Sequence, residues 1–188
     1  MTRRLAFASI VVLVVLCLVG VAVLGVAAGG SAVAYEVNGT RTSQHDFDQQ
    51  LDDIVGTEQG KSQSQSDGSI NSATAARVLQ SNIVLELLRN EADAKGVKVT
   101  ADDRANAKQQ IGSQLEGAPA SYQKLQTEIF ARVIALGLDT DAKVSAFLSR
   151  AVRKADIYVN PRYGRWSPKF GVCPPTGCVT AGAASGSG

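Results

Sequence analysis

The chain has 188 residues, 45% of them apolar and 19% charged, so it can bury a core, and a single domain is the first expectation. Aromatic residues make up only 5%, which favours an aliphatic helical core over a β-sandwich. Arg3 and Arg4 are the only charged residues before Glu36. The rest of the chain therefore contains 17 of the 19 basic residues and all 17 acidic residues. This balance, without a basic run, excludes a typical nucleic-acid-binding protein.

Residues 1–30 have the pattern of an export segment. A positive start at Arg3 and Arg4 precedes 22 uncharged, mostly apolar residues at 5–26. Two interpretations stay open: a signal peptide, for which 32–34 offers an Ala-x-Ala cleavage site, or a transmembrane anchor, because such a stretch can cross a bilayer. The positive end is expected to stay in the cytoplasm. We therefore predict either a membrane protein with its bulk outside the cytoplasm or a secreted protein.

The stretch 69–95 predicts the central helix. Its apolar residues recur at i, i+3 and i+4 and nearly encircle one turn, as expected for a bundle helix with neighbours on several sides. Gly96 fits a left-handed C-cap. Before this helix, a strand at 32–39 leads to a shorter helix that Ser43 caps. The polar Gly/Ser/Gln segment at 56–68 predicts a mobile loop within the domain.

Three further helices are expected after the central one. Thr100 caps the first of them, and Gly117-Ala118-Pro119 separates it from the next. Gly137 ends that helix, and Asp139 is the expected cap of the last one.

A second strand is expected at 155–161, where β-branched and aromatic side chains precede Asn-Pro. Because a lone strand is not stable, we expect it to pair with residues 33–37. The predicted fold is mainly α: a five-helix, bundle-like domain at 31–166, with a small two-stranded sheet that joins its N- and C-terminal segments. The Pro/Gly/Ala-rich segment 167–188 is predicted to be a tail.

Two cysteines lie close together in this tail, Cys173 and Cys178, around a Pro-Pro-Thr-Gly turn. In an exported chain a disulfide between them is the simplest interpretation, although free or intermolecular thiols stay open. A zinc site needs about four ligands, and no further Cys or His is near, so no metal is expected.

The sequence offers little for catalysis. His45 is the only histidine and lies between polar neighbours, which is typical of a solvated surface residue. The carboxylate pairs Asp52-Asp53 and Asp102-Asp103 point in different directions on a helix, so they do not form shared sites. We expect no catalytic residues, no cofactor and no small-molecule substrate.

Four segments together resemble one known family. They are the start AYEVNG at 34–39, Phe47 with Leu51, the run LLRNEADAKGVKVTADD at 87–103, and the end ADIYVNPRYGRW at 155–166. The pattern is similar to the N-terminal chaperone domain of exported bacterial foldases of the SurA and PrsA type. The resemblance covers residues 32 to about 166.

This resemblance implies a helical domain, closed by pairing of its first and last strands, that binds unfolded polypeptide through apolar surface. Many members also carry parvulin prolyl-isomerase domains, but only 32 residues follow Asp156, which are too few for such a domain, and the chain lacks the pair of histidines that a parvulin site uses. We therefore expect a chaperone-like protein, tethered to the membrane or secreted, that binds unfolded or partly folded exported polypeptides without isomerase activity. A cell-envelope scaffold that binds one folded partner is the alternative, and a prolyl isomerase is a distant third.

Five aromatic residues are the candidate client-binding contacts. For those on helices, core packing is the competing interpretation, and the two beyond the last strand are expected to be more exposed. The candidates are Tyr122, Phe130, Phe147, Tyr163 and Trp166.

Overall fold

The computed structural model describes residues 33–55, 72–169 and 171–175. The expected export segment at 1–30, the loop at 56–68 and most of the tail at 167–188 lie outside the described residues. Within them there are five α-helices and five short strands. In chain order the elements are β1 (Val33–Val37), β2 (Thr40–Ser43), α2 (Gln44–Val55), α4 (Ser72–Ala94), α5 (Ala101–Ile111), the 3-10 helix η1 (Gly112–Gln114), α6 (Ala120–Ala135), α7 (Asp141–Lys154), β3 (Ile157–Val159), β4 (Arg165–Ser167) and β5 (Gly171–Cys173).

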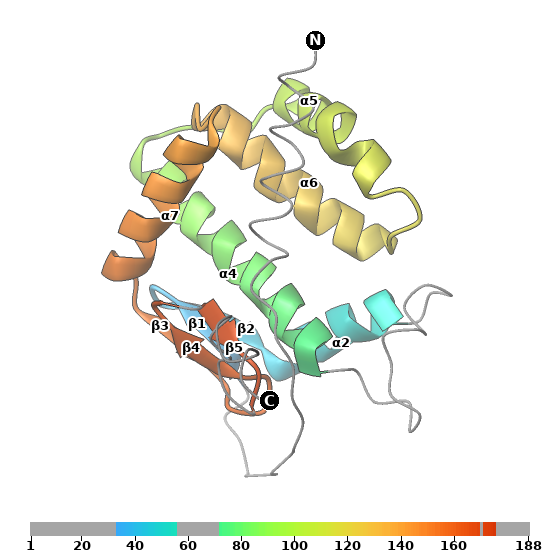
Figure 1. The fold of residues 1–188 in the computed structure, drawn as a ribbon, viewed down its shortest axis with the longest axis vertical. Coiled ribbons are helices and arrows are strands. Elements are labelled where there is room, and N and C mark those ends of the chain that lie inside the picture. Colours follow the sequence, from blue (N-terminus) through green and yellow to red (C-terminus); the bar gives the residue numbers. More distant parts are fainter. Residues whose placement is uncertain (1–32, 56–71, 170, 176–188) are drawn as a thin grey trace, which may run out of the picture.

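Helix α4 runs through the middle of the domain. It has α5 and α6 on one side and α7 on another, and the strands and α2 lie towards its N-terminal end (Figure 1). Leu79, Ile83 and Leu88 are almost completely buried, and shielded residues occur all around the helix. The prediction of a central helix with neighbours on several sides is therefore confirmed. The stability of such a helix comes mainly from tertiary packing rather than from intrinsic propensity.

The predicted helix starts at Ser43 and Thr100 are confirmed. Ser43 Oγ accepts a hydrogen bond from the Asp46 N–H at 3.1 Å. Thr100 and Asp103 form a complete capping box, in which each side chain bonds the backbone N–H of the other residue. The hydrogen bonds from Thr100 also lower the pKa of the Asp103 carboxyl.

The predicted cap at Asp139 is wrong by one residue. The side chain of Thr140 accepts from the Lys143 N–H at 3.3 Å and caps α7. The Asp139 carboxylate instead lies 2.6 Å from the Lys143 ammonium, and this contact lowers the pKa of Asp139. Both residue types are good caps, so the sequence alone did not decide between neighbours.

The predicted C-caps at Gly96 and Gly137 are also confirmed. Both glycines have φ of +65°, which suits a residue without a Cβ. The N–H of the residue after each glycine donates to a carbonyl of the last helical turn, at 2.8 and 2.9 Å. These bonds stop α4 and α6 in the way of a Schellman motif.

The two ends of the domain pair as predicted. β1 is antiparallel to β3, with Tyr35 opposite Val159 and Glu36 opposite Tyr158. The sheet has a third strand, because β2 pairs with the other edge of β1 in the order β2-β1-β3. Asn38 and Gly39, with φ of 50° and 86°, form the tight turn between β1 and β2. The strand β2 was not predicted, since its sequence Thr-Arg-Thr-Ser lacks apolar residues.

A second hairpin, β4 with β5, pairs across the predicted boundary between domain and tail. The Val172 N–H donates to Gln80 Oε1 of α4 at 2.7 Å, and the Val172 side chain is buried in the core. Gly171 has φ of +77°, and a Cβ there would lie 2.3 Å from the Gln80 side chain. Glycine at this position therefore allows β5 to approach the helix.

Asn160 locks the start of β1 to the end of β3. Its N–H donates to the Ala34 carbonyl at 2.8 Å, and its side-chain amide donates to the Val33 carbonyl at 3.0 Å. Its side-chain oxygen accepts from the Arg162 N–H at 3.0 Å. Asn160 is only 6% exposed, so these bonds also satisfy a buried amide.

Buried polar pairs fix the helices around α4. The Asn82 amide donates to Gln50 of α2 at 2.7 Å, and the Gln126 amide of α6 donates to Ser81 at 3.2 Å. On the surface, Glu128 of α6 accepts from Arg104 of α5 at 2.6 Å. A buried amide that loses its hydrogen-bond partner destabilises the fold, because its desolvation is no longer compensated. The two pairs therefore favour one alignment of α2 and α6 against α4.

We predict that Asn160→Ala destabilises the domain by about 2 kcal/mol, because a buried carbonyl and an N–H lose their partners. Urea unfolding followed by circular dichroism measures the free energy of unfolding. The control is Asn106→Ala on the exposed side of α5, which should change it by less than about 0.5 kcal/mol. Equal effects of the two variants would show that Asn160 does not lock the strands.

A second prediction concerns Glu128 and acid stability. Desolvation raises the pKa of Glu128, but hydrogen bonds from Arg104 and Arg132 outweigh this effect, and the pKa lies below its ordinary value of 4.5. A depressed folded-state pKa stabilises the fold above the ordinary value, and this contribution is lost as pH falls through the folded-state pKa. Glu128→Gln should therefore flatten the acid side of the stability profile. Glu116→Gln, at an exposed turn, is the control, and an unchanged slope for Glu128→Gln would contradict the prediction.

Candidate functional site

The five predicted client-binding aromatics do not form one exposed surface. Phe130, Phe147 and Tyr163 are 1%, 2% and 4% exposed and belong to the core. Tyr122 and Trp166 are partly buried and pack against that core. Burial raises the pKa of Tyr122, and Arg77 and Gln126 offset this effect only in part. Only Tyr122 and Trp166 can therefore meet a partner while the domain keeps this structure.

The expected exposure of Tyr163 is wrong, and its surroundings give the reason. Its ring packs edge-on against Phe47, with centroids 4.9 Å apart, and Phe47 packs in the same way against Tyr35 at 6.0 Å. The Tyr163 hydroxyl donates to Asp48 at 2.7 Å, and burial together with this carboxylate raises its pKa. The Arg162 guanidinium lies 5.3 Å from the ring centroid. This aromatic cluster joins α2, β1 and the turn after β3, so its role is structural.

Tyr158 is the one exposed large hydrophobic residue among those that the structure describes, at 43%. It stands opposite Glu36 on the outer face of the sheet, while its neighbour Val159 is buried against the core. The sequence held a signal for this position. Once 33–37 and 155–161 are paired with Tyr35 and Val37 inside, alternation along the strands places Tyr158 outside.

Half-buried aliphatic side chains flank Tyr158 along the chain. Leu148 and Val152 lie four residues apart on α7, and Ile157 begins β3. All three pack against the core with part of their surface exposed. We call Leu148, Val152, Ile157 and Tyr158 the α7–β3 margin. All four residues are apolar, and partly exposed apolar side chains suit weak contacts with varied apolar partners.

Basic residues accompany this margin. Arg150, Arg153 and Lys154 are exposed on α7. Basic residues on a helix edge are typically solvated, and no described residue forms an ion pair with them. Their placement adds positive charge beside the apolar margin.

The carboxylates do not assemble into a catalytic or metal site in the described ranges. No group of three His, Cys, Asp or Glu side chains there could hold a metal ion. Asp52, Asp53 and His45 are exposed on α2, and Asp103 is part of a helix cap.

The described residues contain no helix that is long and apolar enough to cross a membrane, and residues 1–32 lie outside them. Cys173 is buried in β5, whereas Cys178 lies outside the described residues. The anchor and the disulfide both stay predictions.

Comparison with known proteins gives one match. The family model described as SurA-like N-terminal domain matches residues 2–134, more than half of the chain. The match runs from the N-terminus into α6, so α7 and the strands β3, β4 and β5 lie beyond it. No curated protein and no solved structure gives a match.

We predict an intramolecular disulfide between Cys173 and Cys178. In a Cys17→Ser background, both thiols should react with iodoacetamide only after reduction, as measured by intact mass. The chain should also run as a monomer on a non-reducing gel. Alkylation without reduction, or a dimer that reduction dissolves, would contradict the pairing.

Proposed function

The chain belongs to the SurA-like N-terminal domain family, and on this premise we propose that it is an exported, non-enzymatic, chaperone-like protein. In this proposal it binds unfolded or partly folded exported polypeptides through apolar surface. Its N-terminal segment either anchors it in the membrane, with the domain outside the cytoplasm, or is removed to release a secreted protein.

The observation that supports this function is the α7–β3 margin. It contains the exposed ring of Tyr158 and, near it along the chain, the partly exposed side chains of Leu148, Val152 and Ile157, with Ile157 on the opposite face of β3 from Tyr158. Unfolded chains expose apolar side chains in no fixed arrangement. The apolar residues of the margin can bind such side chains transiently without selecting a sequence. The exposed basic residues on α7 favour solubility next to the apolar margin and disfavour self-association of the protein.

Among the aromatic candidates, Tyr122 and Trp166 stay in the proposal as additional contacts at the edge of the core. Phe130, Phe147 and Tyr163 are proposed to contact clients only if local opening exposes them. Such opening would break the bond between Tyr163 and Asp48, so we assign these three a structural role first.

Tyr158→Thr should reduce the holding activity severalfold, because it removes the exposed ring and keeps a residue suited to a strand. The measurement is light scattering of a reduced, aggregating model client in the presence of the full chain in vesicles. Lys98→Thr, in the exposed loop between α4 and α5, is the matched control and should hold the client as well as the native chain.

No suppression of aggregation by the native chain at severalfold excess would contradict the holding function. Saturable binding to one folded envelope protein, with indifference to the unfolded client, would favour the scaffold alternative instead. Turnover in a protease-coupled proline-peptide assay that persists through stringent purification would contradict the absence of isomerase activity.

A further inference from the structure

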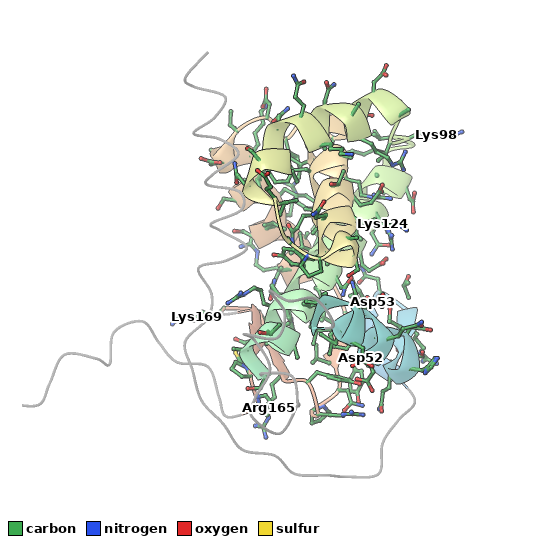
Figure 2. All side chains as sticks on the ribbon, turned by 90° about the vertical axis from the view of Figure 1, so that its right-hand side faces the viewer. Asp52, Asp53, Lys98, Lys124, Arg165 and Lys169 are labelled. Carbon is green, nitrogen blue, oxygen red and sulfur yellow. The ribbon has the colours of Figure 1, made fainter. Side chains whose placement is uncertain are left out.

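Charge is separated between the two sides of the sheet end of the domain. Helix α2 carries Asp46, Asp48, Asp52 and Asp53 and no Lys or Arg. From 157 to 169 the chain carries three exposed basic residues and no acidic residue. Figure 2 shows Asp52 and Asp53 on α2, with Arg165 at the lower end of the molecule and Lys169 on the side away from α2. We call Arg162, Arg165 and Lys169 the basic end.

The basic end lies where the chain enters the fold. The Val33 carbonyl, at the start of β1, accepts a hydrogen bond from Asn160, which is two residues before Arg162. Arg165 begins β4, directly after the same turn. Of the nearby carboxylates, Asp48 lies 3.3 Å from Arg162, and Asp46 bonds the Ser43 hydroxyl. Asp52 and Asp53 lie further along α2, which leads away from the sheet (Figure 1).

The length of chain before Val33 limits how far this end can stand from a membrane. Only residues 27–32 separate the apolar stretch 5–26 from β1. Six residues span at most about 20 Å when fully extended. If residues 5–26 cross the bilayer, the domain is held close to the lipid headgroups, where a few basic residues have a large effect.

We propose that the basic end docks on anionic phospholipid headgroups of the membrane that holds the N-terminal segment. The proposal rests on the anchor proposed above and is independent of client binding. Docking at this end directs the acidic part of α2 away from the anionic surface. It also sets the α7–β3 margin at a fixed orientation to the membrane, since both belong to one packed domain.

Trp166 is a built-in probe for this docking, because it is the only tryptophan of the chain and follows Arg165 directly. The full chain is reconstituted in vesicles of neutral phosphatidylcholine or with phosphatidylglycerol, each with a dansyl-labelled headgroup lipid. We expect more energy transfer from Trp166 to dansyl in the anionic vesicles, and a decrease as salt is raised.

The variant Arg165→Glu/Lys169→Glu should lose this difference between lipids. Removing two basic residues is expected to lower the ratio of docked to undocked domain by at least about tenfold. The matched control, Lys98→Glu/Lys124→Glu, makes the same charge change on the α5–α6 half of the molecule (Figure 2) and should keep the difference. Circular dichroism and Trp166 emission without acceptor check that both variants are folded.

Equal transfer in the two lipids, or equal loss in the two variants, would overturn the proposal. Binding of polyglutamate at the basic end without any dependence on lipid charge would overturn it as well and assign this end to acidic polypeptides. Extraction of the intact chain from the vesicles by alkaline carbonate would overturn its premise, because it would show that residues 5–26 do not span the bilayer. None of these results bears on the light-scattering test of client holding.

Discussion

The pairing of β1 with β3 is the interaction on which the rest of the structure depends. It joins backbone groups of residues as far as 124 positions apart, Tyr35 and Val159, so the chain between them must fold back on itself. The entropy cost of closing such a loop grows only slowly with its length and is offset by the core that closure completes. The hydrogen bonds of Asn160 and the ring contacts of the Tyr35–Phe47–Tyr163 cluster stabilise this pairing.

The β1–β3 pairing also determines where the two ends of the domain lie. The start of β1 and the hairpin that follows β3 lie at the same end of the molecule, while α5 and α6 lie at the opposite end (Figure 1). A tether at the N-terminus would therefore hold the β4–β5 hairpin close to it. The same arrangement leaves one flank, formed by α7 and β3, with partly exposed apolar residues that the core does not cover.

The sequence predicted the elements with strong local signals. Ser43, Thr100, Gly96 and Gly137 mark helix ends through side-chain caps and positive φ, which depend on neighbouring residues alone. The β1–β3 pairing was also predictable, because a lone strand at each end needs a partner. The strands β2, β4 and β5 were missed, since their short sequences have few apolar residues. They become strands only through the Asn38-Gly39 turn, the pairing of β4 with β5 and the contact of β5 with Gln80.

The candidate site was harder to predict than the fold. Aromatic residues on helices serve equally well in a core or on a binding surface, and burial depends on packing that periodicity does not resolve. Tyr163 illustrates this, because its bond to Asp48 links residues 115 positions apart. The exposure of Tyr158, in contrast, follows from strand alternation once the pairing is known.

If the domain binds unfolded chains along the α7–β3 margin, site-specific photo-crosslinking should detect this contact most directly. A benzoylphenylalanine replaces Tyr158 in one full-length chain and Lys98 in another, and each is irradiated with an unfolded and with a folded form of one client. The account predicts crosslinks to the unfolded client from position 158 and few from position 98. Equal crosslinking from both positions, or none from 158, would contradict it.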